Sequence, residues 1–195
     1  YGPGYVLETD ITYLFYGHKR SKAYLSVVKD GFTKQILAYI LSPSLEVDFV
    51  LETINQLYSK HKHNIHTDAL IHSDQGVHYT SVKFIDLLKS LEIRQSMSRR
   101  GNCWDNAPQE SFFGHMKDEI GRYIENAGSY EELKEIVDSY MVYYNNDRYQ
   151  YNLAKLSPNE YFEYYMTGEY PLNHITKEPD EYKEKFRQVR NNLDR

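Results

Sequence analysis

Three acidic residues constrain the fold of this chain more than any other feature, because each stands where a folded protein seldom places an acid. Asp10 interrupts the run Val6–Phe15, which otherwise has the composition of a β-strand. Asp74 ends a second strand-like run, Ala69–Asp74, and Glu110 lies near the start of a helical pattern. Asp is disfavoured inside strands, and a partly buried acid without a partner carries a desolvation cost. A fold that brings these acids together therefore needs a counter-charge.

A divalent cation would provide that counter-charge, because it stabilises every ionised carboxylate around it. Mg²⁺ and Mn²⁺ prefer hard oxygen ligands, and two such ions about 3.5–4 Å apart support in-line phosphoryl transfer. Asp74 and Glu110 have 35 residues between them (110 − 74 − 1). Two strand acids followed by a helix acid at this interval predict a two-metal phosphoryl-transfer site. On spacing alone, three unrelated solvated acids among the 28 in the chain are an equal alternative.

Longer segments resemble the integrase-type catalytic core of bacterial insertion-sequence DDE transposases, which are similar to retroviral integrases. In chain order, these segments are Asp10–Tyr13, His72–Ser81, Gln95–Phe113, Met116–Glu119, Tyr143–Arg148 and Leu156–Tyr161. They follow the order and spacing of the family over roughly residues 5–165. The resemblance implies an RNase H-like fold, a D,D(35)E metal triad, and cleavage and transfer of DNA strands. By position, the triad corresponds to Asp10, Asp74 and Glu110.

The resemblance also implies a cofactor, partners and further DNA contacts. Two Mg²⁺ or Mn²⁺ ions would bind the triad when DNA is present, the DNA would be transposon ends and target, and the full-length protein would be a homo-oligomer. Lys117 stands two helical turns after Glu110, where such families carry a basic residue, and we expect it to bind a phosphate. Gln75, Gly76 and Tyr79 follow Asp74 in the family motif. For these three residues, contact with DNA and support of the Asp74 loop are both open.

The polar segment before the Glu110 helix supplies the remaining candidate DNA contacts. Residues 96–108 contain a glycine, two adjacent arginines and the only Trp of the chain, a composition typical of loops beside an active site. The Trp ring would stack on a base and the arginines would bind phosphates. Packing of the Trp ring under the loop is an equal alternative. The predicted contacts are Arg99, Arg100, Asn102, Trp104 and Asn106.

The rest of the pattern predicts an α/β fold, with a five-stranded mixed sheet flanked by helices. Alternation indicates strands over residues 5–16, 23–29 and 34–42, the last two joined by the turn signal Asp30-Gly31. Short strands are expected up to Asp74 and over 93–98. Helices are expected over about 45–62, 81–91 and 130–145, besides the Glu110 helix. The resemblance, and not the pattern, sets the first and fourth strands side by side.

One face of the predicted Glu110 helix carries Glu110, Gly114, Lys117 and Gly121. Each glycine costs a helix about 1 kcal/mol relative to alanine. Their position beside the acid and the lysine therefore suggests a close approach by DNA. The alternative is that another helix packs closely against the two glycines.

Composition agrees with a single catalytic core over residues 1–168. The chain has 195 residues, 41% of them hydrophobic and 26% charged, which is ordinary for a globular protein. It has no apolar run near the roughly 20 residues needed to cross a bilayer, and the lone Cys103 favours the reducing bacterial cytoplasm. We expect residues 169–195 to form a charged, helical extension. We also expect that the DNA-binding elements that usually precede such cores are absent from this sequence.

The net charge of −5 is the feature that fits a DNA-binding protein least, because such proteins usually present a basic face. Basic residues are nevertheless clustered, with Lys19, Arg20 and Lys22 in the first predicted hairpin. Two alternatives to a transposase stay open. One is an RNase H-like nuclease that cuts DNA without joining it. The other is a catalytically silent, transposon-derived module for DNA binding or assembly.

Overall fold

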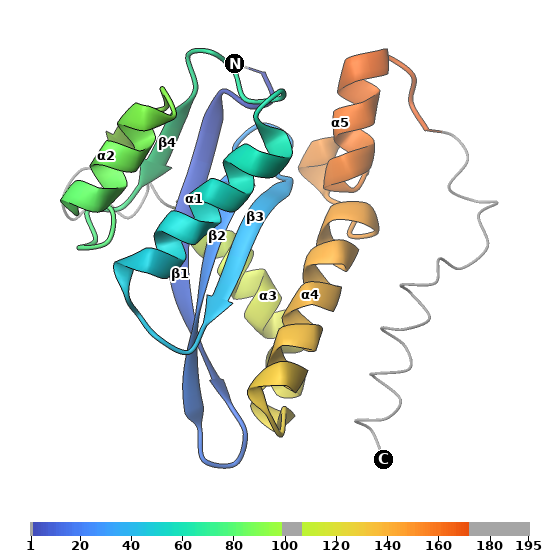
Figure 1. Ribbon diagram of the computed structural model, residues 1–195. Coiled ribbons are helices and arrows are strands. Elements are labelled where there is room, and N and C mark those ends of the chain that lie inside the picture. Colours follow the sequence, from blue (N-terminus) through green and yellow to red (C-terminus); the bar gives the residue numbers. More distant parts are fainter. Residues whose placement is uncertain (1, 99–106, 172–195) are drawn as a thin grey trace.

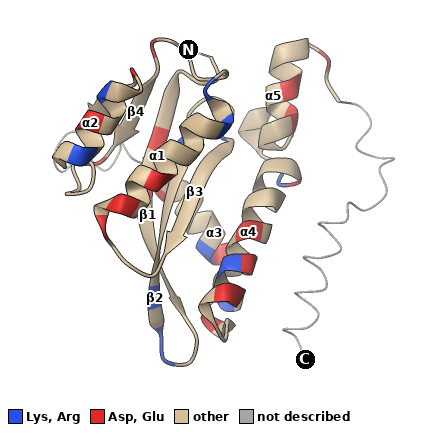
Figure 2. Cartoon of the chain, in the orientation of Figure 1, with Lys and Arg blue, Asp and Glu red and all other residues tan. Residues whose placement is uncertain are grey.

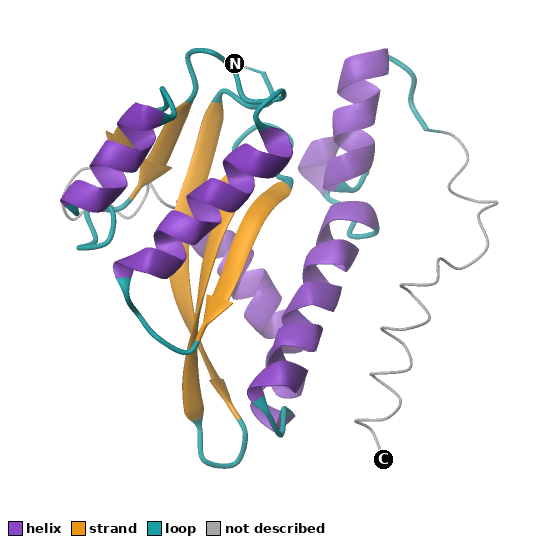
Figure 3. Cartoon of the chain, in the orientation of Figure 1, coloured by secondary structure: helices purple, strands orange, loops and turns teal. Residues whose placement is uncertain are grey.

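The computed structural model describes residues 2–98 and 107–171, which form one sheet with helices on both faces (Figures 1 and 3). The elements are β1 (Val6–Tyr16), β2 (Ser21–Asp30), β3 (Ile36–Ser42), α1 (Val47–His61), β4 (Leu70–Ser73), α2 (Val82–Ser90), β5 (Arg94–Met97), α3 (Ala107–Asn126), α4 (Tyr130–Asn146), the 3₁₀ helix η2 (Tyr151–Leu153) and α5 (Pro158–Thr167). None of the described helices has the length and apolar character needed to cross a membrane.

The sheet has the order β3-β2-β1-β4-β5. β1 pairs with β2, and β2 with β3, in antiparallel fashion, whereas β1 with β4 and β4 with β5 are parallel. The five-stranded mixed sheet and the adjacency of the first and fourth strands are thus confirmed. α5 was not predicted, although Ser157 and Glu160 form a capping box at its start, a pattern visible in the sequence.

Two hydrophobic layers cover the two faces of the sheet. α1 and α2 cover one face, with a core that includes Leu7, Ile54 and Ile71. α3 and α4 cover the other face, around Leu14 and Met116. In Figure 1, α1 lies in front of the sheet and α3 behind it. Each layer buries an apolar helix stripe against the alternate residues of the strands, which is the main source of stability for such a fold.

This alternation also sets the direction in which Asp10 points. Successive side chains of a strand face opposite sides of the sheet. Leu7 belongs to the α1 layer and Leu14 to the α3 layer, so Glu8 and Asp10 face α3. Ala23, Leu25 and Val27 of β2 share that face, which leaves Asp10 at the polar end of an otherwise apolar surface.

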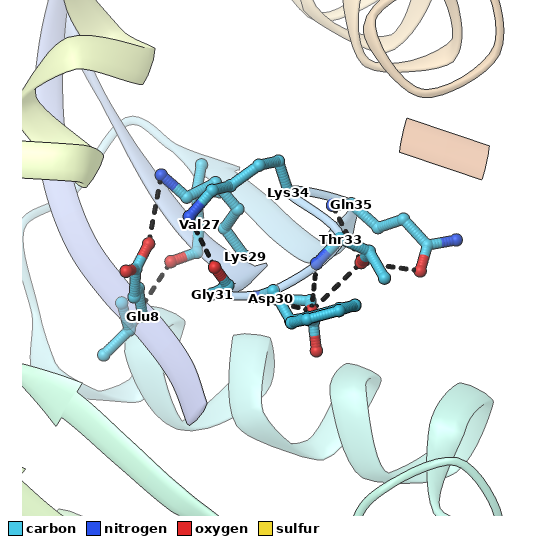
Figure 4. Close-up of polar contacts among 10 residues, drawn as sticks. Glu8, Val27, Lys29, Asp30, Gly31, Thr33, Lys34 and Gln35 are labelled. Carbon is cyan, nitrogen blue, oxygen red and sulfur yellow. Dashed lines mark hydrogen bonds and ion pairs between the residues drawn. The ribbon is translucent and has the colours of Figure 1, made fainter. Parts of the chain in front are cut away.

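The β2–β3 turn and a buried ion pair fix the neighbouring part of the sheet (Figure 4). The Asp30 carboxylate accepts hydrogen bonds from the backbone N–H groups of Gly4 at 2.6 Å, Phe32 at 2.9 Å and Thr33 at 2.6 Å. Glu8 lies opposite Lys29 in the strand register, and their side chains meet at 3.1 Å. Lys29 is only 2% exposed. Glu8 shares a strand face with Asp10, yet its charge is already paired.

Candidate active site

The parallel pairing of β1 with β4 runs towards two of the three predicted acids. Val6, Leu7 and Glu8 lie opposite Leu70, Ile71 and His72. If this register continued by two residues, it would set Asp74 beside Asp10. The Ser98 N–H donates to the Ser73 carbonyl at 2.9 Å, so β5 supports the end of β4 at the same level.

A tight turn holds the Asp74 carboxylate. Its Oδ1 accepts the Gly76 N–H at 2.8 Å, and a Cβ built on Gly76 would lie 2.8 Å from that same oxygen. A side chain at position 76 would therefore displace the carboxylate. Of the two roles left open for Gly76, this contact favours support of the Asp74 loop, since Asp-x-Gly is a signal for a turn in which Asp accepts a hydrogen bond from its own backbone two residues on. Asp10 is held locally as well, since its Oδ1 accepts the Ile11 N–H at 2.8 Å.

The charges of Asp10 and Asp74 both act on the hydroxyl of Tyr79. Tyr79 is 1% exposed, and burial raises its pKa well above the ordinary value, with the charges of Asp10 and Asp74 adding to the effect. Its backbone carbonyl accepts a 2.7 Å hydrogen bond from Gln95. Of the two roles left open for Tyr79, this burial favours support of the Asp74 loop. Gln75, which is exposed, donates to the Ser98 carbonyl at 3.1 Å and ties that loop to β5.

Glu110 is exposed in the first turn of α3, which packs on β1 through Phe113 and Met116. Within residues 2–98 and 107–171, no three His, Cys, Asp or Glu side chains lie close enough together to hold a metal ion. The three predicted acids thus do not form a closed metal-binding cluster within the described residues.

The exposed face of α3 is open where the two glycines lie. A Cβ on Gly114 or Gly121 would meet no described atom within 4 Å, so packing of a described helix on this face is not what these glycines serve. Lys117 lies on the same face, with its Nζ 5.1 Å from the centre of the Tyr13 ring. Burial lowers its pKa. The core stripe of α3 contains Phe112, Phe113, Met116, Ile120 and Ile124.

Several predicted site residues cannot be placed. Arg99, Arg100, Asn102, Trp104 and Asn106 lie outside the described residues. The same holds for most of the predicted extension, from residue 172 to 195.

A cavity of about 520 Å³ lies between α3, the end of α4 and the β2–β3 turn, away from the three acids. Three cations line it, but each already has a partner. Lys29 pairs with Glu8, the Lys34 ammonium donates to the Gly31 carbonyl, and Arg148 donates to Glu119 at 2.6 Å. Figure 4 shows the first two of these contacts. The paired charges mark this cavity as a structural junction, apart from the candidate site.

Comparison with known proteins identifies relatives along most of the chain. Residues 1–103 match a family model described as "Integrase core domain", and residues 91–158 match a second model of that description. A protein named as the InsK transposase of insertion sequence element IS150 from Escherichia coli (strain K12) is 40% identical over 139 residues. That match covers 71% of this chain and 48% of the relative, so the chain spans about half the relative's length.

Solved structures agree with the predicted fold. A chain of the simian T-cell lymphotropic virus intasome in complex with the PP2A regulatory subunit B56 gamma has a TM-score of 0.70 at 16% identity, covering 92% of this chain and 61% of that one. The HTLV-2 integrase catalytic core domain in complex with magnesium has a TM-score of 0.62 at 17% identity, covering 83% of this chain and 97% of that one. At these identities the likeness concerns the fold alone, and it confirms the RNase H-like architecture.

The two matched regions contain all three acids. Asp10 and Asp74 lie in the first region and Glu110 in the second. The first model alone covers more than half of the 195 residues. The chain belongs to the integrase core domain family.

Proposed function

We propose that this chain is the catalytic domain of a DDE transposase, which cleaves DNA strands and transfers them with the help of divalent metal ions. The observation that carries the proposal is the parallel β1–β4 register, which would set Asp74 beside Asp10 if it continued two residues past Glu8 and His72. Two acids on neighbouring parallel strands repel each other unless a cation lies between them. The membership of the integrase core family and the transposase named among the relatives support the same chemistry.

The donor set fits Mg²⁺ or Mn²⁺. Carboxylate oxygens are the ligands that these ions prefer, and Asp10 and Asp74 each keep part of their surface in solvent. In the active assembly, Asp10, Asp74 and Glu110 would hold the metal, with Glu110 contributed by the first turn of α3. When bound, two ions would activate the attacking oxygen and stabilise the leaving one. The described residues orient this donor set: Gly76 fixes Asp74, and Tyr79 supports the loop from below.

DNA contacts would extend from the acids along α3 and the loops. Lys117 stands seven residues after Glu110 on the open face of α3, about 10 Å along the helix. It would bind a phosphate and position the strand without reading its sequence. Gln75 would contact the DNA strand from the Asp74 loop. The remaining contacts would come from Arg99, Arg100, Asn102, Trp104 and Asn106.

The full-length protein would act as a homo-oligomer in the bacterial cytoplasm. Strand transfer joins DNA ends to a target, and bringing two ends together requires more than one catalytic core. The intasome among the similar structures is an assembly of this kind by name.

A strand-transfer assay with precut DNA ends and Mg²⁺ tests the proposal. We expect Asp10→Asn, Asp74→Asn and Glu110→Gln each to abolish transfer while the thermal unfolding midpoint changes little. Asp86→Asn, an exposed acid on α2, is the matched control and should leave transfer unchanged. Retained metal-dependent transfer in any triad variant would contradict the assignment. Cleavage without transfer by the wild type would indicate the nuclease, and neither activity would indicate a silent module.

Metal affinity supplies an independent test. Calorimetric titration with Mn²⁺ should detect binding by the wild-type chain, and Asp74→Asn should weaken that binding at least tenfold, because one of the two adjacent ligand carboxylates is lost. Equal affinities for both proteins would mean that the ions bind elsewhere.

A further inference from the structure

The projecting end of the β1–β2 hairpin is basic in an otherwise acidic chain. Between Asp10 and Asp30 the sequence contains no Asp or Glu, while Lys19, Arg20 and Lys22 are exposed at or beside the turn. The hairpin extends beyond the rest of the sheet in Figure 1, and in Figure 2 this end carries Lys and Arg but no Asp or Glu. This local excess of positive charge contrasts with the net charge of −5 of the whole chain.

These cations have no anionic partner among the described side chains. The ion pairs of residues 2–98 and 107–171 involve Lys29, Lys83, Lys89, Lys134 and Arg148, and none involves the hairpin cations or Lys117. Exposed lysines and arginines without carboxylates nearby are the groups that phosphates recruit, because each contact releases a counterion from the DNA.

Two aromatic rings contact three of these cations, Arg20, Lys22 and Lys117. The Lys22 ammonium lies 5.6 Å from the centre of the Tyr13 ring and 5.4 Å from that of Phe15. The Arg20 guanidinium carbon lies 5.1 Å from the Phe15 ring centre, and Lys117 reaches Tyr13 from α3. The rings themselves pack edge to face, with centres 5.4 Å apart. Cation–π contacts restrict long flexible side chains, so less entropy is lost when the cations bind a ligand.

The position of this surface relates it to the candidate site. Tyr13 follows Asp10 by three residues on β1, or about 10 Å along a strand, and the hairpin turn begins at Gly17, about 23 Å from Asp10. A DNA duplex advances 3.4 Å per base pair, so these distances correspond to roughly three to seven base pairs. Tyr13 is 54% exposed, and the pairing of β4 with β1 stops before Asp10, which leaves this side of β1 accessible in the described part of the chain.

We propose that a basic hairpin surface, formed by Tyr13, Phe15, Lys19, Arg20, Lys22 and Lys117, binds the phosphate backbone of duplex DNA about three to seven base pairs from the metal site. The inference rests on the proposed function, because it assumes that DNA reaches the acids. The surface positions the duplex, and its contacts carry no sequence information of their own. It also accounts for a DNA-binding domain whose overall charge is negative.

Fluorescence anisotropy with a labelled duplex, in EDTA and over a series of KCl concentrations, tests the surface without requiring catalysis. The hairpin variant is Lys19→Gln/Arg20→Gln/Lys22→Gln. The control Lys60→Gln/Lys62→Gln/Lys89→Gln removes the same charge from exposed positions on and beside α1 and α2. We expect the hairpin variant to bind at least tenfold more weakly and its salt slope to fall by about 2 to 3, at about 0.9 per lost phosphate contact. The control should change affinity less than twofold.

A second variant distinguishes the charge of the cations from their positioning by the two aromatic rings. Tyr13→Leu/Phe15→Leu keeps every cation and removes both rings, so affinity should fall several-fold with the salt slope nearly unchanged. Unchanged thermal unfolding midpoints verify that all variants fold. Equal losses in the hairpin variant and the control, no loss in the hairpin variant, or no salt-dependent binding by the wild type would each overturn the inference.

The strand-transfer assay with Asp74→Asn, run in parallel, distinguishes the two proposals. Loss of transfer in Asp74→Asn, together with wild-type DNA affinity in the hairpin variant, would overturn the hairpin surface alone. Hairpin-dependent DNA binding by a wild-type chain that neither cleaves nor transfers DNA would support the surface and overturn the proposed function.

Discussion

At the scale of single residues, the candidate site depends on a contact between a glycine and a carboxylate. The Gly76 N–H donates to the Asp74 carboxylate at 2.8 Å. Because Gly76 has no Cβ, no side chain displaces that carboxylate oxygen. The short Asp side chain suits such a turn, because it reaches the backbone two residues on. One backbone N–H thereby fixes the orientation of a proposed metal ligand before any metal arrives.

Gly76→Ala tests this contact. The new methyl group would lie 2.8 Å from the Asp74 oxygen and push the carboxylate aside. We expect at least a tenfold loss of Mn²⁺ affinity and of strand transfer, with a small change in stability. Gly128→Ala is the control, because its Cβ would meet Glu132 only at an ordinary 3.4 Å. Wild-type metal affinity in Gly76→Ala would show that the position of Asp74 is not critical.

The buried pair of Glu8 and Lys29 gives a second prediction at this scale. Lys29→Met leaves Glu8 unpaired beside the core and should destabilise the fold by about 3–5 kcal/mol, whereas Lys29→Met/Glu8→Leu should be close to neutral. Lys83→Met is a matched control: its pair with Asp48 has the same 3.1 Å distance but is about two-thirds exposed, and its loss should cost less than about 1 kcal/mol. Denaturant unfolding measures all three, and equal costs for Lys29→Met and Lys83→Met would contradict the argument.

At the scale of elements, α3 serves two purposes with two faces. Its core face carries Phe112, Phe113, Met116, Ile120 and Ile124 against the sheet and α4. Its open face carries Glu110, Gly114, Lys117 and Gly121, and no described atom approaches the glycines. The two glycines lower the stability of α3, but they leave the backbone on its open face accessible.

Gly114→Ala/Gly121→Ala tests that exchange. Because both positions are open, alanine should raise the free energy of unfolding by about 0.5–1 kcal/mol per site. If DNA approaches the helix backbone here, the added methyl groups should lower strand transfer and DNA affinity several-fold. A variant that is more stable and transfers DNA as well as the wild type would mean that DNA does not approach this face closely.

The sequence predicted most elements to within a few residues, because alternation and helical spacing report on burial directly. Pattern alone did not pair β1 with β4, because a parallel pairing leaves no local signal, and the family resemblance supplied it. The partners of Glu8 and Glu119 were not predicted either, because the Glu8–Lys29 pair depends on the exact register of β1 against β2. Glu119 accepts hydrogen bonds from Arg148 and Tyr140, both on or just beyond α4, and such contacts depend on how distant elements meet. The assignment of Glu110 to the site stays a prediction, because no three His, Cys, Asp or Glu side chains of the described residues lie close enough together to hold a metal ion.

At the scale of the whole molecule, buried tyrosines make the stability of the fold depend on pH. Burial raises the pKa of five of them above the ordinary value, and nearby acids add to the effect. These residues are Tyr39, Tyr79, Tyr130, Tyr140 and Tyr144. The folded state therefore keeps protons that the unfolded chain releases near pH 10. Burial lowers the pKa of Lys29 and Lys117, and this acts in the opposite direction.

We therefore expect alkaline destabilisation. A group whose pKa is raised by folding contributes stability below its unfolded pKa and loses it as the pH rises towards the folded value. The thermal unfolding midpoint should fall from about pH 9.5 upwards, and tyrosinate absorbance should rise together with unfolding. Tyr140→Phe should make the fall shallower, although it lowers stability at neutral pH by removing the hydrogen bond to Glu119. A midpoint that is constant up to about pH 11 would contradict the prediction.

The parallel pairing of β1 with β4 also implies an order in which the parts of the sheet fold. The β1–β2–β3 part of the sheet can form from adjacent hairpins, whereas Asp10 gains its neighbour only when the chain has closed the long segment that ends at β4. A nascent or partly folded chain has the first aspartate without the second. The proposed chemistry would thus be confined to molecules whose sheet is complete, so that metal affinity reports on folding as well as on function.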